Sequence, residues 1–315
     1  MASYLLRRLL VTSATLAFAA FVVFTIVELL PGNAAQTMLG ATATPEAVAA
    51  LAHKLGLDKP PPLRFLEWIG GLARGDFGLS YAYNTPIGAL LGDALAVSAP
   101  LALMAMMIAA ATGFFAGLHA ARRRGGRGDA LISAFSQIGL AIPNFWFGIV
   151  LVLIFAVHLR IAPSGGFPGW SYPLRALGAL ILPALSLGLV QGAVLTRIVR
   201  SALIDAEGED FMRTARAKGL SREAALLRHA LPNAMTPILT VGGLQFAFLL
   251  AGAIVIEHVF TLPGLGRLVF QSISNRDALV VEDCVLVLAA IVIAVNFLVD
   301  FVCAAIDPRL RARSA

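Results

Sequence analysis

The sequence has 315 residues, of which 59% are hydrophobic and 13% are charged, and its mean hydropathy is +0.84. Soluble domains carry about 25% charged residues, so this composition excludes an ordinary soluble protein and makes lipid the expected solvent. The net charge of +6 does not indicate nucleic-acid binding, because Lys and Arg lie in short blocks between apolar stretches without interleaved aromatic residues.

A helix that spans a bilayer needs about 20 mostly apolar residues, and six stretches of the sequence meet that length. They are residues 9–30, 95–118, 130–157, 177–198, 236–256 and 284–306. The first stretch is too long for a typical signal peptide and no Ala-x-Ala cleavage site follows it at a suitable distance, so we expect a retained helix. The predicted fold class is an all-α membrane protein with six transmembrane helices.

The distribution of Lys and Arg predicts the orientation of these helices. If the N-terminus is cytoplasmic, 16 of the 24 basic residues lie in the inner segments 1–8, 119–129, 197–235 and 307–315. Four of the other eight lie in the long outer loop, whose charges count little toward orientation. Both termini are therefore predicted to be cytoplasmic. The expected organisation is a first helix with an outer loop (1–94), a five-helix domain (95–306) and a tail (307–315).

The outer loop is expected to form an ordered cap. Pro45 starts an amphipathic run that ends at Gly56, and three prolines, 60–62, break the chain before a second helical segment at 64–72. This cap is too small to be a catalytic domain.

Several predicted spans contain helix breakers and amides. Pro143 and Pro183 each remove a backbone hydrogen bond and should bend the third and fourth helices. Interhelical hydrogen bonding is the simpler explanation of any single amide. Together with the bends, however, the amides indicate a solute pathway between the helices. The pathway candidates are Pro143, Asn144, Gln191, Gln245 and Asn296.

The inner loop between the fourth and fifth spans, residues 200–235, carries the strongest local signals. A short helix is predicted over 210–218, with acidic residues at its start and Lys218 at its end. Gly219 suits a left-handed residue that ends this helix, and Ser221 suits the N-cap of a second helix, which Pro232 is expected to end. We call this segment, residues 200–235, the coupling loop.

Two interpretations of the coupling loop remain open at this point. A solvated basic loop explains its charge but not the two caps or the glycine between them. A rigid two-helix projection that docks on a partner explains all three features. In that case small Ala215 and Ala217 allow close approach of a partner backbone, and Phe211 provides an apolar anchor.

The coupling loop resembles the EAA loop of ABC-importer permeases. Ala215 is followed by Gly219, and Leu231 and Pro232 come twelve and thirteen residues after that glycine. The run from Arg213 through Thr214, Ala215, Arg216, Ala217 and Lys218 to Gly219 is similar to the version in dipeptide, oligopeptide and nickel permeases. The sequence departs from the general pattern at Arg213 and Thr214, where Glu and Ala would stand, and at His229, where Ile is usual. The peptide-type variant accepts the first two departures.

The resemblance covers nearly the whole chain. Five short motifs follow in the expected order: Leu29-Leu-Pro-Gly32, Gly75-Asp-Phe-Gly78, Ile142-Pro-Asn-Phe-Trp146, Pro263-Gly-Leu-Gly-Arg267 and Asp307-Pro-Arg309. The family implies a type I ABC-importer fold in a bacterial inner membrane. It also implies a second homologous permease subunit, two ABC ATPase subunits docked on the EAA loops, and an extracytoplasmic solute-binding protein. The coupling residues implied are Arg213, Thr214, Ala215, Ala217, Lys218, Gly219, Leu231 and Pro232.

No sequence motif indicates that this chain catalyses a reaction or binds a cofactor. No Gly-x4-Gly-Lys-Ser/Thr motif occurs, so ATP is expected to be used by partner subunits and no cofactor is expected here. No histidine lies within a predicted span beside a carboxylate, and neither His-Glu-x-x-His nor Gly-x-Ser-x-Gly occurs, so an enzyme is disfavoured. No catalytic or metal-binding residue is predicted. Cys284 and Cys303 lie at opposite ends of one span and cannot bond to each other.

An ion-coupled secondary transporter is the remaining alternative. That class usually places ionisable groups near the middle of the bilayer. Glu28 is expected near the outer end of the first span, and Asp300 about two turns from the inner end of the sixth. We interpret Glu28 as an interfacial residue and Asp300 as a structural partner for a neighbouring helix.

The substrate is the least determined property. The resemblance allows short peptides, nickel chelates, glutathione or opine-like compounds. A route for bare metal would favour His, Cys or carboxylate ligands within the spans. The polar groups there are mainly neutral amides, so short peptides are predicted, with nickel or a nickel chelate as the alternative.

Overall fold

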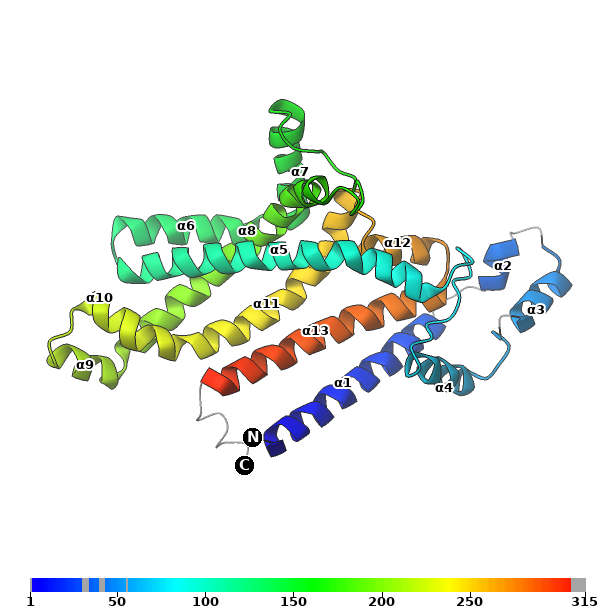
Figure 1. The fold of residues 1–315 in the computed structure, drawn as a ribbon, viewed down its shortest axis with the longest axis horizontal. Coiled ribbons are helices and arrows are strands. Elements are labelled where there is room, and N and C mark those ends of the chain that lie inside the picture. The colour runs from blue at the N-terminus through cyan, green and yellow to red at the C-terminus, as the bar shows by residue number, and fades with distance from the viewer. Residues whose placement is uncertain (1, 30–33, 40–42, 55, 307–315) are drawn as a thin grey trace. The chain divides into compact units, whose positions relative to one another are not determined.

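A computed structural model describes residues 2–29, 34–39, 43–54 and 56–306. The described residues are almost entirely helical, without a regular strand, and only one isolated bridge joins Leu79 to Pro86. They form two compact units (Figure 1). Unit 1 comprises residues 99–262 and 294–306 together with the start of the first helix, and unit 2 comprises residues 6–98 and 263–293. Two long helices, α5 and α13, contribute to both units.

Unit 2 holds the N-terminal helix and the cap. Its helices are α1 (Ala2–Leu29), α2 (Ala34–Leu39), α3 (Pro45–Lys54), α4 (Pro61–Leu72), α12 (Leu265–Ser274) and the adjoining parts of α5 (Ile87–Arg122) and α13 (Ala278–Ile306). The expectation of two cap helices separated by a proline break is confirmed, since Pro61 starts α4 and Gly56 adopts a φ of +68°. The sequence did not predict α2 or α12.

The cap is fixed to α1 and α13 by aromatic and acidic side chains. Trp68 lies 8% exposed beside Phe24 and donates its indole hydrogen to Asp283 at 2.8 Å. The Arg64 guanidinium lies 3.0 Å from the Glu28 carboxylate, so Glu28 does not simply face the interface as expected but pairs with the cap. These contacts hold α4 against α1 and α13.

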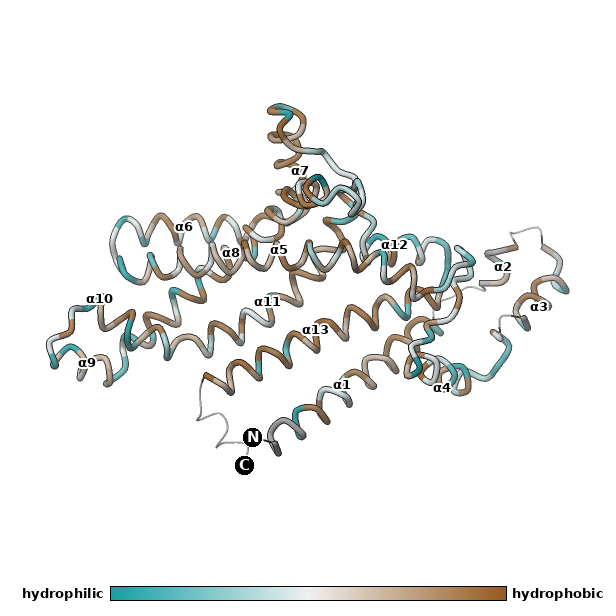
Figure 2. The backbone as a smooth tube through the Cα atoms, viewed as in Figure 1, coloured by the Kyte–Doolittle hydropathy of each residue, from teal (hydrophilic) through white to brown (hydrophobic). Residues whose placement is uncertain are grey.

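Unit 1 holds the remaining long helices. They are α6 (Arg127–Ala141), α7 (Asn144–Leu151) with the π-helix η1 (Val152–His158), α8 (Pro173–Gly208), α9 (Asp210–Ala217), α10 (Arg222–Ala225) with the π-helix η2 (Leu226–Ala230), and α11 (Leu231–Val259). The most extensive packing joins α8 to α11 and to α6. Figure 2 shows that the long helices are mostly hydrophobic, whereas the α5–α6 turn and the α9–α10 region are hydrophilic.

Five helices of the described chain are long and apolar enough to cross a membrane, and the number is six if the bent pair α6–α7 forms one span. Pro143 does more than bend the third span, because the helix direction changes by 102° between α6 and α7. A proline there cannot donate its backbone hydrogen, and Ile142 before it has the extended conformation that prolines favour in the preceding residue, so the helix ends and restarts. Pro183, by contrast, lies inside continuous α8.

Paired glycines bring α5 and α8 into close contact. A Cβ atom at Gly113 would lie 2.5 Å from Leu195 Cβ, and one at Gly188 would lie 2.7 Å from the Ala105 carbonyl oxygen. Gly117 and Gly192, each four residues further along its helix, make similarly close contacts. Both helices thus carry a Gly-x3-Gly pair, which lets backbones approach where lipid provides no hydrophobic drive for helix association.

Candidate functional site

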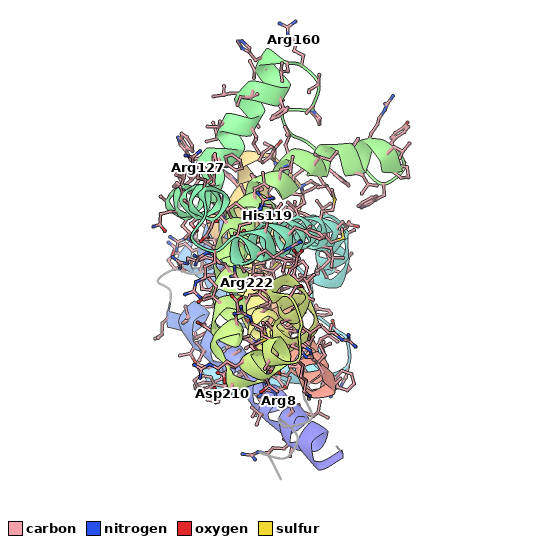
Figure 3. The ribbon with its side chains drawn as sticks, turned by 90° about the vertical axis from the view of Figure 1, so that its left-hand side faces the viewer. Arg8, His119, Arg127, Arg160, Asp210 and Arg222 are labelled. Carbon is pink, nitrogen blue, oxygen red and sulfur yellow. The ribbon has the colours of Figure 1, made fainter. Side chains whose placement is uncertain are left out.

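The coupling loop folds into two short helices joined by a tight turn at one end of unit 1. Figure 3 looks onto this end, with Asp210 of α9 and Arg222 of α10 labelled. Gly219 has φ +92°, and the Leu220 and Gly219 amides donate to the Ala215 and Arg216 carbonyls at 3.3 and 2.9 Å. This is a Schellman ending with glycine in the left-handed position, as predicted.

The second helix begins as the sequence predicted. Ser221 is its N-cap, and its hydroxyl accepts the Ala224 amide hydrogen at 3.2 Å. Glu223 follows in the first turn, where a carboxylate complements the positive end of the helix. Both ends of the turn therefore have local hydrogen-bond partners.

The prediction that Pro232 ends the second helix is wrong. Instead, α10 continues through η2 directly into α11, and Pro232 is the second residue of α11. The π-helical turn before it widens the hydrogen-bond spacing, and the Asn233 side chain donates to the His229 carbonyl at 2.7 Å. The helix therefore continues past Pro232. The projection is consequently continuous with α11.

The inner face of α9 packs against the rest of unit 1. Met212 and Ala215 are 1% and 6% exposed and belong to one apolar cluster with Val199 and Leu203 of α8 and Leu226 of η2. The small size of Ala215 therefore serves packing within the chain. Its Cβ is not on the surface that a partner would approach, contrary to the reason given for it from the sequence.

The outer face of α9 is exposed and basic. Arg213 has a side chain that is 82% exposed, Phe211 is 38% exposed, and Arg216, Ala217 and Lys218 are also exposed. Thr214 bonds back to the Asp210 carbonyl at 3.2 Å. Of the coupling residues implied by the resemblance, Leu231 packs partly buried beside the apolar cluster and Pro232 is exposed. The exposed face of α9 thus presents an aromatic ring beside several cationic side chains.

Arg222 connects the projection to two other helices. Its guanidinium donates to both carboxylate oxygens of Glu207 on α8, at 2.5 and 3.0 Å. It also donates to the carbonyls of Arg122 and Ala121 at the end of α5, at 3.5 and 3.4 Å. Arg122 in turn pairs with Glu223 of α10. We call Arg222, Glu207, Arg122 and Glu223 the arginine clasp; sequence reasoning missed it, because its members lie up to 101 residues apart.

A second bidentate pair fixes α6 to α8. Arg200 donates from Nε and Nη2 to the Asp129 carboxylate at 2.5 and 2.8 Å, and Asp129 is 5% exposed. The Gly125 amide donates to the same carboxylate at 2.9 Å. The α5–α6 turn and the base of the coupling loop are thus tied to α8 by two Arg–carboxylate pairs, whose fork geometry resists rotation.

The pathway candidates divide between two faces of α11. A Cβ at Gly252 would lie 2.8 Å from the Asn144 amide nitrogen, and one at Gly243 would lie 3.2 Å from the Asn296 amide oxygen. Nine residues of helix place these two glycines on opposite faces. Asn144 and Asn296 are therefore not brought together.

The two glutamines can be placed by their positions along α8 and α11. Gln245 is seven residues before Gly252 and so shares its face. Gln191 is 8% exposed and follows by one turn Leu187, which also contacts Gly252. Asn144 thus lies where α7 meets α11, while the role of all five candidates in a pathway stays a prediction.

No group of three or more His, Cys, Asp or Glu side chains that could hold a metal ion occurs among the described residues. Cys284 and Cys303 are free and buried. Asp300 is half-buried on α13, and its assignment as a structural partner stays a prediction.

These features define a multi-span membrane protein with a packed helical projection beyond its apolar helices. Residues 110–312 match the family described as binding-protein-dependent transport system inner membrane component, and residues 1–101 match the family described as its N-terminal part. The chain belongs to this family and is a multi-pass permease component of the bacterial inner membrane.

Relatives match along the full length. The chain is 37% identical over 312 residues to the probable peptide ABC transporter permease protein y4tP of Sinorhizobium fredii, covering 99% of this chain and 100% of the relative. It is 37% identical to a putative peptide transport system permease protein of Brucella abortus, with 99% of each chain covered. It is also 38% identical to the glutathione transport system permease protein GsiC of Salmonella typhimurium, again with 99% of each covered.

Proposed function

We propose that this chain is one of two homologous permease subunits of an ATP-driven importer for short peptides, delivered by an extracytoplasmic solute-binding protein. Its partners would include two ABC ATPase subunits, which bind and hydrolyse ATP, while this chain carries out no chemistry and holds no cofactor. The observation that carries the proposal is the coupling loop, a capped two-helix projection with an exposed aromatic and cationic face.

The coupling residues are proposed to act in two groups. Arg213, Ala217 and Lys218 are exposed on or beside α9 and would contact the ATPase. Ala215, Gly219 and Leu231 would keep the projection rigid, because they pack its inner face or permit its turn. Since η2 runs into α11 without a break, movement of the ATPase would be transmitted directly to that transmembrane helix.

The proposed orientation places the coupling loop and both termini in the cytoplasm and the cap outside. The basic bias of the inner segments supports it. The cap, held to α1 and α13 by Arg64 and Trp68, would then face the solute-binding protein.

Short peptides are the proposed substrates because relatives matching along the whole chain are named for peptides and for glutathione, itself a tripeptide. The amides of Asn144, Gln191 and Gln245 carry no charge and offer both donors and acceptors, as peptide backbones require. Nickel or a nickel chelate is the alternative, and the described residues offer no cluster of metal ligands for it.

Uptake in a deletion strain tests the substrate. Without this permease, growth on di- and tripeptides and uptake of glutathione should fall, and the native gene should restore them. Nickel accumulation under metal limitation should remain normal. Intact peptide and glutathione use together with lost nickel accumulation would overturn the assignment in favour of nickel.

A further inference from the structure

The turn between α5 and α6 carries more positive charge than its surroundings neutralise. Arg122, Arg123, Arg124 and Arg127 are all exposed. The acidic groups nearby already have partners: Arg122 pairs with Glu223, Arg200 with Asp129, and Arg222 with Glu207. Throughout the described chain, neither Arg123 nor Arg127 has a carboxylate within ion-pair distance.

Arg123 and Arg127 gather at the start of α6. The Arg123 Cδ atom lies 3.6 Å from the position of a Cβ at Gly128, so this side chain from the end of α5 extends over the first turn of α6. Arg127 is the first residue of α6 (Figure 3). Arg124 instead contributes to the electrostatic environment of Glu207 on α8. Two guanidinium groups are therefore available at one end of α6.

An exposed apolar stripe continues along α6 from these arginines. Leu131, Phe135 and Ile138 are 61%, 71% and 56% exposed. Together with Arg127 they follow a spacing of four, four and three residues, which places all four on one face of a helix. This face has Arg127 at its end and about two turns of hydrocarbon beyond it, and the Arg123 side chain lies beside that end, over Gly128.

We propose that Arg123 and Arg127 bind the phosphate of an anionic phospholipid, and that its acyl chain lies along Leu131, Phe135 and Ile138. The amphiphile matches the face in both parts: guanidinium groups pair with phosphate oxygens in a bidentate manner, and an apolar stripe in a membrane favours hydrocarbon. A soluble anion would leave the stripe unused, and a purely apolar partner would leave the arginines uncompensated. The assignment to the cytoplasmic leaflet rests on the proposed orientation of the coupling loop.

A photoreactive lipid tests the proposal in the assembled importer. The complex, reconstituted in zwitterionic membranes, is given a trace of phosphatidylglycerol or phosphatidylcholine with a diazirine in the acyl chain. After illumination, labelled residues are mapped by mass spectrometry. We expect labelling within 131–138 to be at least fivefold stronger with phosphatidylglycerol and to fall when NaCl is raised to about 0.5 M, because salt screens exposed charges.

Matched variants assign the effect to the two arginines. The double variant Arg123→Gln/Arg127→Gln should reduce phosphatidylglycerol labelling about fivefold or more, whereas Arg74→Gln, which removes one exposed charge from the outer loop, should leave it unchanged. The salt and headgroup comparisons on the native complex decide the question even if the double variant does not assemble.

Three results would overturn the proposal. Equal labelling by both lipids would show that the stripe contacts only ordinary surrounding lipid. Unchanged labelling of the double variant would show that the two arginines do not bind the lipid. Efficient crosslinking of Phe135→Cys to the second permease would show that protein covers the stripe. None of these measurements uses transport or ATP, so their failure is distinct from a failure of the proposed function.

Discussion

The guanidinium of Arg222 and the carboxylate of Glu207 form a bidentate pair, with Nε–Oε1 and Nη2–Oε2 distances of 2.5 and 3.0 Å. Glu207 belongs to the end of α8, and Arg222 opens the helix that leads into α11. The pair therefore closes the coupling loop at its base, so that α9 is held between two transmembrane helices. The same guanidinium reaches the end of α5 through two carbonyls.

We expect Arg222→Gln to weaken coupling between ATP hydrolysis and transport. The change removes charge-assisted hydrogen bonds, which contribute about 1.5–3 kcal/mol each, and leaves Glu207 without its cation. Transport per ATP should fall about tenfold, equivalent to ~1.4 kcal/mol. Hydrogen exchange should become faster over residues 209–221. The exchanged pair Glu207→Arg/Arg222→Glu should recover part of the loss. Normal coupling in Arg222→Gln would show that the clasp does not position the projection.

The neighbouring alanines of α9 should respond differently to the same change. Ala215 is 6% exposed in an apolar cluster, so Ala215→Asp buries an unpaired charge, costs roughly 3 kcal/mol or more and unfolds the projection. Ala217 is exposed, so Ala217→Asp should leave the permease folded but weaken ATPase binding. Limited proteolysis reports the first effect and co-purification the second. Equal protease sensitivity of the two variants would contradict the two assigned faces.

The loss of stability caused by a substitution at Gly219 should depend on backbone strain alone. Its φ is +92°, and a Cβ would meet no atom within 4 Å, so space does not limit the replacement. Gly219→Val should cost roughly 1–2 kcal/mol and impair coupling, because β-branched residues strongly resist positive φ. Gly219→Asn should be milder, since Asn tolerates that region better. Thermal unfolding and uptake assays would show the order; a larger loss for Asn would rule out strain as the cause.

The contact between α5 and α8 should tolerate only small residues. Gly192 lies against Thr112 and the Ala109 carbonyl, so Gly192→Leu forces the helices apart at a cost of about 1–3 kcal/mol. At Gly178 on the same helix, an added Cβ atom would meet nothing within 4 Å, so Gly178→Leu serves as the matched control. The yield of folded protein in detergent measures both. Indistinguishable yields would mean that this contact adapts more readily than its distances imply.

Cysteine labelling should establish the orientation. In a background without Cys284 and Cys303, a membrane-impermeant reagent applied from outside should modify Ala43→Cys in the cap but not Gly126→Cys in the α5–α6 turn. After the membrane is permeabilised, Gly126→Cys should also react, which controls for intrinsic accessibility. The reverse pattern on intact cells would invert the proposed topology.

The sequence by itself determined the class of protein and much of the coupling loop. Backbone groups in lipid must form their hydrogen bonds within the chain, so a segment that spans the membrane is a helix. The length of each apolar stretch was therefore enough to locate the spans. The turn at Gly219 and the cap at Ser221 were likewise predictable, because both depend on backbone conformation and hydrogen bonds within a few residues.

Only the tertiary structure decided which side of each local element faces a neighbour. It placed Ala215 inside and Ala217 outside, and it showed that Pro232 lies within a helix that continues from a π-helical turn. It also formed the Arg222–Glu207 and Arg200–Asp129 pairs. Their partners lie 15 and 71 residues apart, and no local propensity specifies such pairs; they exist because helix packing brings charged ends together.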